Sequence, residues 1–180
     1  MDWVNWLAET LQKFLVGIEQ DRKAGIIGPS LGLQVPLGSG YSAEDDESRK
    51  RAKIVAYCRA QLSKVYQFGV EVGPGQESQS WDCSELSEVA YREAGLQIPD
   101  GARYQFDFCR AAQSPLPGDL GFLWSDDRGM IGHVMISTGS GSVIHAVGGR
   151  GVVEDWATNW EISPRWRGWR RHPDFSTRTP

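Results

Sequence analysis

The segment QSWDCSELSEVAYREAGL, residues 79–96, predicts an amphipathic helix with an unusual beginning. Asp82 has a side chain that commonly caps the first turn of a helix. Gly95 is typical of the residue just after a helix end. The apolar positions between them recur at helical spacing and predict one buried face: Leu86, Val89 and Ala90.

Cys83 would then lie in the first turn of this helix, directly after the cap. Unpaired backbone N–H groups and the helix dipole stabilise a thiolate at such a position, and the same N–H groups can bind an oxyanion. A cysteine at a helix start can also be a buried structural residue. The rest of the chain has to supply the partners that decide between the two roles.

Two histidines lie in the predicted hairpin HVMISTGSGSVIHAV, residues 133–147. A two-residue loop at 140–141 would place His133 and His145 on opposite faces of the hairpin. A three-residue loop at 139–141 would place them on one face as diagonal neighbours, about 5–8 Å apart. Glycine suits the last position of such a loop. We therefore predict the three-residue register, with the two rings within reach of each other.

Composition limits the other kinds of protein that the chain could be. The 180 residues include 40% hydrophobic residues and eight tryptophans, enough for one folded domain, and the net charge of −4 gives no case for nucleic-acid binding. No run of 18 apolar residues predicts a membrane span. Three cysteines cannot all pair within one chain, and their spacing matches no zinc motif. Cys58 and Cys109 are expected to be packed thiols.

The chain divides into three predicted parts. Residues 1–45 combine an amphipathic helix at 2–20 with a Gly- and Pro-rich linker, residues 46–172 form the domain, and residues 173–180 form a tail. The first helix either packs on its own domain or docks onto a protein partner. The start of the chain lacks the features of a secretory signal, so we expect synthesis in the cytoplasm.

Within the domain, helices precede strands. A helix at about 46–64 is expected to bury Ile54, Val55, Cys58 and Leu62. After Pro117 the pattern changes to period two, with short strands at 118–124, 133–138, 142–148, 151–156 and 165–171. In the last of these, the tryptophans are expected to face the core and the arginines the solvent. The order indicates an α+β fold, with helices packed on an antiparallel sheet.

Several blocks resemble, in order, the motifs of the NlpC/p60 cysteine peptidases. They are WDCSEL, YREAGLQIP, LPGDLGFLW, GHVMISTGSG and VIHA, and the resemblance covers about residues 50–171. It implies a papain-like fold and a cell-wall hydrolase that cuts stem peptides at γ-D-glutamyl–diamino acid bonds. It implies a Cys-His-His triad with no metal or cofactor: Cys83, His133 and His145. It also implies that Tyr66 contributes to the oxyanion site and that Asp82 and Ser84 shape the substrate pocket.

The sequence departs from the family pattern at two positions. Glu85 and Val70 stand where glycine is usual, which affects the pocket and leaves the triad intact. His172 is given no role. Two alternatives remain open: a thiol amidase or acyltransferase of the same fold, and a non-catalytic module of a phage or secretion apparatus. Without a signal, a wall hydrolase would need a non-Sec route such as phage lysis or toxin delivery.

Overall fold

The computed structural model describes residues 43–176, and the predicted helix at 2–20, its linker and residues 177–180 lie outside this range. The described helices are α2 (Ala43–Ala60), α3 (Cys83–Glu93), α4 (Ala102–Phe108) and α5 (Thr158–Glu161). The strands are β1 (Val65–Tyr66), β2 (Ser80–Trp81), β3 (Arg110–Ala112), β4 (Leu120–Ser125), β5 (Met130–Ser137), β6 (Ser142–Val147), β7 (Gly151–Trp156) and β8 (Trp166–Arg171).

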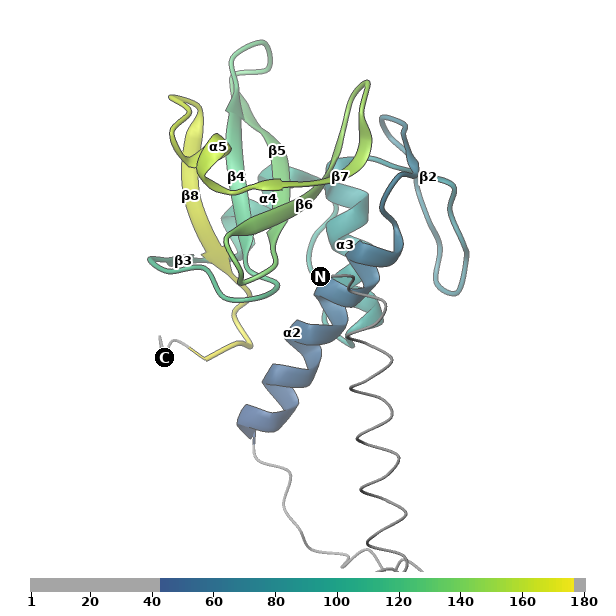
Figure 1. The fold of residues 1–180 in the computed structure, drawn as a ribbon, viewed down its shortest axis with the longest axis vertical. Helices are drawn as coiled ribbons and strands as arrows, with labels where there is room; N and C mark the ends of the chain where they lie inside the picture. The colour runs from purple at the N-terminus through teal and green to yellow at the C-terminus, as the bar shows by residue number, and fades with distance from the viewer. Residues whose placement is uncertain (1–42, 177–180) are drawn as a thin grey trace, which may run out of the picture. The chain divides into compact units, whose positions relative to one another are not determined.

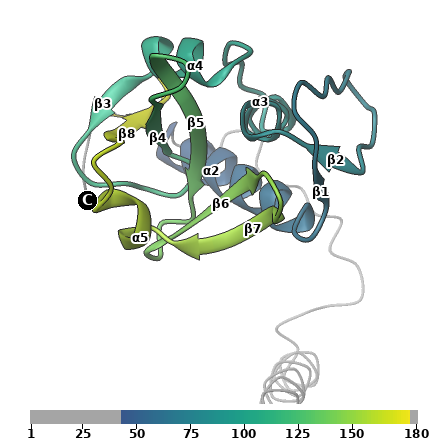
Figure 2. The ribbon, with the colours of Figure 1, turned by 90° about the horizontal axis from the view of Figure 1, so that it is seen from above.

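The main sheet has six antiparallel strands in the order β3-β8-β4-β5-β6-β7, and β1 and β2 form a small parallel pair. Helices α2 and α3 lie side by side and pack against β5 and β6 (Figure 1, Figure 2). The predicted α+β class is confirmed. None of the helices among residues 43–176 is long and apolar enough to cross a bilayer.

The main core lies between the helices and the sheet. Leu86, Val89 and Ala90 of α3 are buried there, as the spacing predicted. They pack with apolar residues of the central strands: Leu120, Phe122, Val134, Ile136 and Ile144. A smaller cluster on the sheet contains Met135, Val143, Ala157 and Trp169, with Trp160 and Trp166 against it. The central strands β4, β5 and β6 contribute residues to both clusters, so packing in the two clusters fixes their position.

Helix α2 differs in its limits from the prediction. It begins at Ala43 and ends at Ala60, so Leu62 lies beyond its end and is exposed, whereas Cys58 is fully buried as expected. At the other end of the domain, Phe175 is 2% exposed and packs in the core. The described chain therefore remains part of the domain beyond residue 172, where the tail was predicted to begin.

The last strand, β8, corrects another expectation. The pairing of β4 with β8 shifts register between Gly121 and Leu123, which brings Trp166 and Trp169 together with ring centroids 5.0 Å apart. A Cβ atom at Gly121 would meet both indoles at under 3.0 Å, so this strand position requires glycine. Arg171 does not face solvent: it is 5% exposed and paired with a buried carboxylate.

Candidate active site

Helix α3 begins as its sequence predicted, with Asp82 as the N-cap. The Oδ1 atom of Asp82 accepts hydrogen bonds from the backbone of Glu85 at 2.8 Å and the hydroxyl of Ser84 at 3.0 Å. Its Oδ2 atom accepts from the backbone of Gly69 at 3.0 Å, which ties the loop after β1 to the helix. One carboxylate thus holds Cys83 in the first turn and fixes the loop beside it.

Cys83 lines a cavity of about 320 Å³ next to this turn. The predicted Tyr66, Asp82 and Ser84 line the same cavity, and so do Gly132 and Ile131 of β5. The sulfur also forms a hydrogen bond with the backbone of Val134, the residue after His133. The structure therefore brings the helix tip to the strand that carries the first histidine.

The hairpin of β5 and β6 has the predicted three-residue register. Ile136 pairs with Ile144, and the backbone of Thr138 bonds to Ser142 across the loop 139–141. The ladder between the strands does not continue toward the histidines. The two rings nevertheless meet, with Nε2 of His133 2.8 Å from Nδ1 of His145. The prediction that the rings meet on one face is confirmed.

A carboxylate that the sequence analysis missed completes this set. Oδ2 of Asp155 lies 3.1 Å from Nε2 of His145, on the side of the ring away from His133. Once β6 and β7 are paired in register, His145 lies opposite Val153, and Asp155 is the next residue on the same face. The three-residue turn at 148–150 sets this register, so its length in the sequence could have predicted that Asp155 lies on the same face as His145.

Burial sets the charge states of the thiol and the imidazoles. It raises the pKa of Cys83 to about 11, although the backbone hydrogen bond from Val134 opposes the shift. Burial, and then the charge of His145, lowers the pKa of His133 to about 3. The first-turn position was expected to stabilise a thiolate, but burial opposes this stabilisation and favours the neutral forms of both the thiol and the imidazole.

His133 has the free acceptor that a general base needs. Its Nε2 atom bonds to His145, and among the described residues no hydrogen bond is found at its Nδ1 atom. The thiol of Cys83 is not hydrogen-bonded to that atom in the resting structure. Contacts between base and nucleophile often tighten only when substrate binds.

The cavity is also lined by side chains that the sequence did not point to. Phe68 and Tyr104 are 65% and 62% exposed and form apolar walls. Arg103 and Arg128 add positive charge, and the guanidinium of Arg128 lies 4.7 Å from the centre of the Phe68 ring. These residues come from loops and a short helix, which sequence periodicity does not place.

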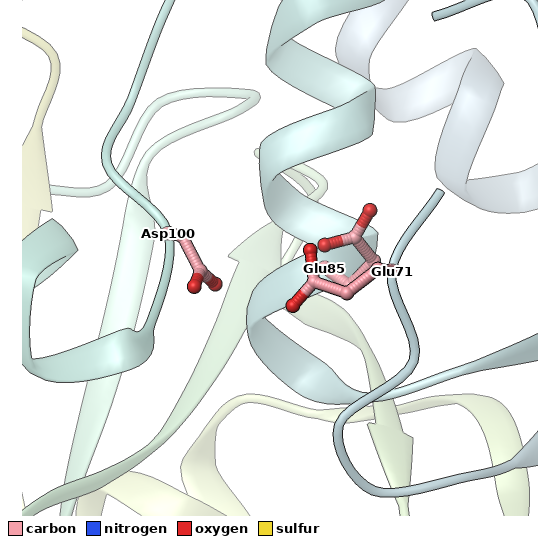
Figure 3. Close-up of side chains that lie close together, drawn as sticks. All are labelled: Glu71, Glu85 and Asp100. Atoms are coloured by element: carbon pink, nitrogen blue, oxygen red, sulfur yellow. The ribbon is translucent and has the colours of Figure 1, made fainter. Parts of the chain in front are cut away.

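Glu71, Glu85 and Asp100 form an acidic cluster, with carboxylate oxygens within 4.8 Å of one another (Figure 3). Glu85 projects from the first turn of α3 and accepts a hydrogen bond from the backbone of Val72 at 2.8 Å. Burial, and then the charges of Glu88 and Glu71, raise the pKa of Glu85 to about 7. The cluster has the oxygen ligands that a cation or an ammonium group prefers, and the departure from glycine at position 85 creates it.

Solved structures similar to this chain share its fold. NlpC1 from Trichomonas vaginalis superimposes with a TM-score of 0.58 at 24% identity, over 69% of this chain and 44% of that one. The P60 domain of M. avium subspecies paratuberculosis antigen MAP1204 gives 0.56 at 20% identity, over 72% and 98%. The NlpC/p60 domain of peptidoglycan hydrolase SagA gives 0.52 at 26% identity, over 67% and 96%.

This chain spans less than half the length of the NlpC1 chain that it resembles. A comparison with curated protein sequences gave no match. The model of the NlpC/P60 family, in contrast, matches residues 63–171, which include α3, the cavity and both histidines. The chain belongs to the NlpC/P60 family.

Proposed function

We propose that the chain is a cysteine peptidase that hydrolyses amide bonds in bacterial cell-wall stem peptides, at the γ-D-glutamyl–diamino acid bond. Cys83 is the nucleophile, His133 the general base, and His145 orients the His133 ring. The observation that carries the proposal is a thiol in the first turn of a helix that lines a cavity and bonds to the backbone of Val134, the residue after one of two coupled imidazoles. Family membership and the likeness to a peptidoglycan hydrolase domain support it.

In the acylation step, Nδ1 of His133 takes the proton of the Cys83 thiol. The sulfur then forms a bond to the carbonyl carbon, and the electron pair of the C=O bond moves to the oxygen. The backbone N–H of Cys83 and the hydroxyl of Tyr66 are the proposed donors to this oxyanion. When the C=O bond re-forms, the C–N bond breaks, and the proton on His133 passes to the leaving amine.

In the deacylation step, water attacks the thioester and gives a proton to His133. The C–S bond breaks, the acyl half leaves as a carboxylic acid, and the proton on His133 returns to the sulfur. No group outside the chain is needed to balance either step. Burial lowers the pKa of His133, so in the resting structure its ring is unprotonated at neutral pH before it takes the proton of the thiol.

The cavity suits a short peptide that carries charges of both signs. Carboxylates of Asp82, Glu71 and Asp100 and the guanidiniums of Arg103 and Arg128 all line it. A stem peptide presents free carboxylate and ammonium groups around its amide bonds. The aromatic walls at Phe68 and Tyr104 would contact its aliphatic portions.

The test is digestion of purified peptidoglycan by the full chain, with product masses determined by mass spectrometry. The wild-type protein should release fragments cut between D-glutamate and the diamino acid. Cys83→Ala should release none, and Cys58→Ala is the matched control because Cys58 is fully buried and not in the cavity. Equal product from Cys83→Ala would overturn the proposal, and cleavage of a different amide would favour another thiol amidase.

A further inference from the structure

The hydrogen bond between His133 and His145 is part of a longer chain of hydrogen bonds. From His133 it runs to His145 at 2.8 Å and then to Asp155 at 3.1 Å. Asp155 in turn receives two hydrogen bonds from the guanidinium of Arg150, each 2.8 Å long. Three ring and carboxylate groups from β5, β6 and β7 are thus arranged in a line.

Hydrogen-bond chemistry fixes where the protons lie along this line. A carboxylate only accepts, so Nε2 of His145 must carry the hydrogen that faces Asp155. A neutral His145 then has an unprotonated Nδ1, which can only accept. Nε2 of His133 must therefore donate to it, and Nδ1 of His133 is left with its lone pair. That is the atom the proposed chemistry requires as the base.

The opposite proton arrangement would disable the base. If His145 carried its hydrogen on Nδ1, His133 would have to accept at Nε2 and carry its own hydrogen on Nδ1. It could then not take a proton from a thiol. Two neutral imidazoles joined to each other favour protonation on Nε2 only modestly, so an outside group is needed to hold one arrangement firmly.

The surroundings hold the selecting carboxylate charged and in place. The paired guanidinium of Arg150 is the main cause that lowers the pKa of Asp155 to about 2. The indole of Trp160 packs edge-on to the His145 ring, with centroids 4.9 Å apart, and also approaches the His133 ring. His145 is fully buried, so its ring has little freedom to turn away from the carboxylate.

We propose that Asp155 is a positioning residue that fixes the tautomers of His145 and His133, so that Nδ1 of His133 remains free to act as the base. This inference rests on the proposed function for its consequence, but the tautomers exist without substrate. Arg150 supports the role by orienting the carboxylate. Asp155 itself touches neither the substrate nor the thiol.

The test compares two neighbouring carboxylates of β7 in the full chain. Asp155→Ala removes the group that bonds to His145. Glu154→Ala is the matched control, because Glu154 bonds to Ser142 and pairs with Arg59 instead. Nitrogen-15 NMR of the histidine side chains at pH 7 gives the tautomers, and cleavage of a stem peptide gives kcat/KM.

In the wild-type protein and in Glu154→Ala, both rings should be protonated on Nε2. In Asp155→Ala each ring should become a mixture of tautomers, and kcat/KM should fall about 10- to 100-fold, less than the loss of the base itself. A wild-type His145 protonated on Nδ1, or unchanged tautomers in Asp155→Ala, would overturn the inference. The wild-type spectrum decides even if the variant fails to fold, and absence of any peptidase activity would count against the proposed function alone.

Discussion

Asp119 and Asp155 are both carboxylates paired with arginine, but their hydrogen-bond networks differ: the first is closed, and the second ends at an atom without a partner. Asp119 is fully buried and accepts hydrogen bonds from the guanidiniums of Arg51 and Arg171 and from the backbone of Leu116. Both of those arginines are also buried. Both oxygens of the Asp119 carboxylate therefore accept hydrogen bonds from other residues of the domain.

The network of Asp155 is instead open at one end. It passes through His145 to His133, whose Nδ1 atom has no partner among residues 43–176. This difference distinguishes a network that stabilises the fold from one that can take part in the proposed reaction. A closed buried network contributes stability and a fixed geometry, whereas a network that ends in an acceptor without a partner has an atom that can take a proton.

Asp119→Ala should have the largest effect on stability. It leaves the buried Arg171 without a carboxylate and the buried Arg51 with Glu47 alone, which costs about 3–5 kcal/mol in the free energy of unfolding. Asp155→Ala should cost much less, because the side chain of its partner Arg150 is 49% exposed and can turn to solvent. Urea denaturation of both variants measures the difference. Equal losses in the two would contradict the division into a structural and a functional network.

Glu85→Gln should have a smaller effect with a distinct pH dependence. The pKa of Glu85 is raised from 4.5 to about 7, so the folded state holds a proton that the unfolded state has lost between these values. The stability of the wild-type protein should therefore fall as pH rises from 5 to 7 through this group. Glutamine carries no charge and still offers an oxygen to the backbone of Val72.

The variant should accordingly gain stability relative to wild type as pH rises, on the order of 1–2 kcal/mol at pH 8, and show no gain at pH 4. Thermal denaturation at the two pH values measures it. Glu77→Gln is a useful control, because Glu77 is exposed and lies outside the acidic cluster. A gain for Glu85→Gln that is the same at both pH values would show that charge at position 85 is not its cause.

Local patterns were sufficient to predict much of the fold. The cap at Asp82, the stop at Gly95 and the alternating strands after Pro117 depend on neighbouring residues, and the structure has them. The prediction failed where distant contacts decide. Arg171 is buried because it pairs with Asp119, which lies just before the adjacent strand β4. The packing of the two tryptophans was expected, but the register shift of β8 that brings their rings together was not. Neither cause can be read from the residues of one strand.

The candidate site divides in the same way. The pairing of His133 with His145 follows from loop length within one hairpin, so the sequence predicted it. Asp155 depends on the register of a second hairpin. The acidic cluster joins Glu71 and Asp100, which lie on separate loops, to the start of α3. Only the folded chain brings these three segments together.

The central claim is that an imidazole activates the thiol at the start of α3, and cysteine alkylation tests it without a substrate. Burial raises the pKa of Cys58 and Cys109 to about 12 and that of Cys83 to about 11. At pH 7 Cys83 can therefore react quickly only if its proton passes to His133. The measurement is the rate of iodoacetamide labelling of each cysteine at pH 7, by peptide mass spectrometry, in the wild-type protein and in His133→Ala.

We expect Cys83 to be labelled fastest in the wild-type protein and to slow about tenfold or more in His133→Ala, with Cys58 and Cys109 unchanged. Labelling of Cys83 at the rate of the other two cysteines, or at the same rate with and without His133, would contradict the account.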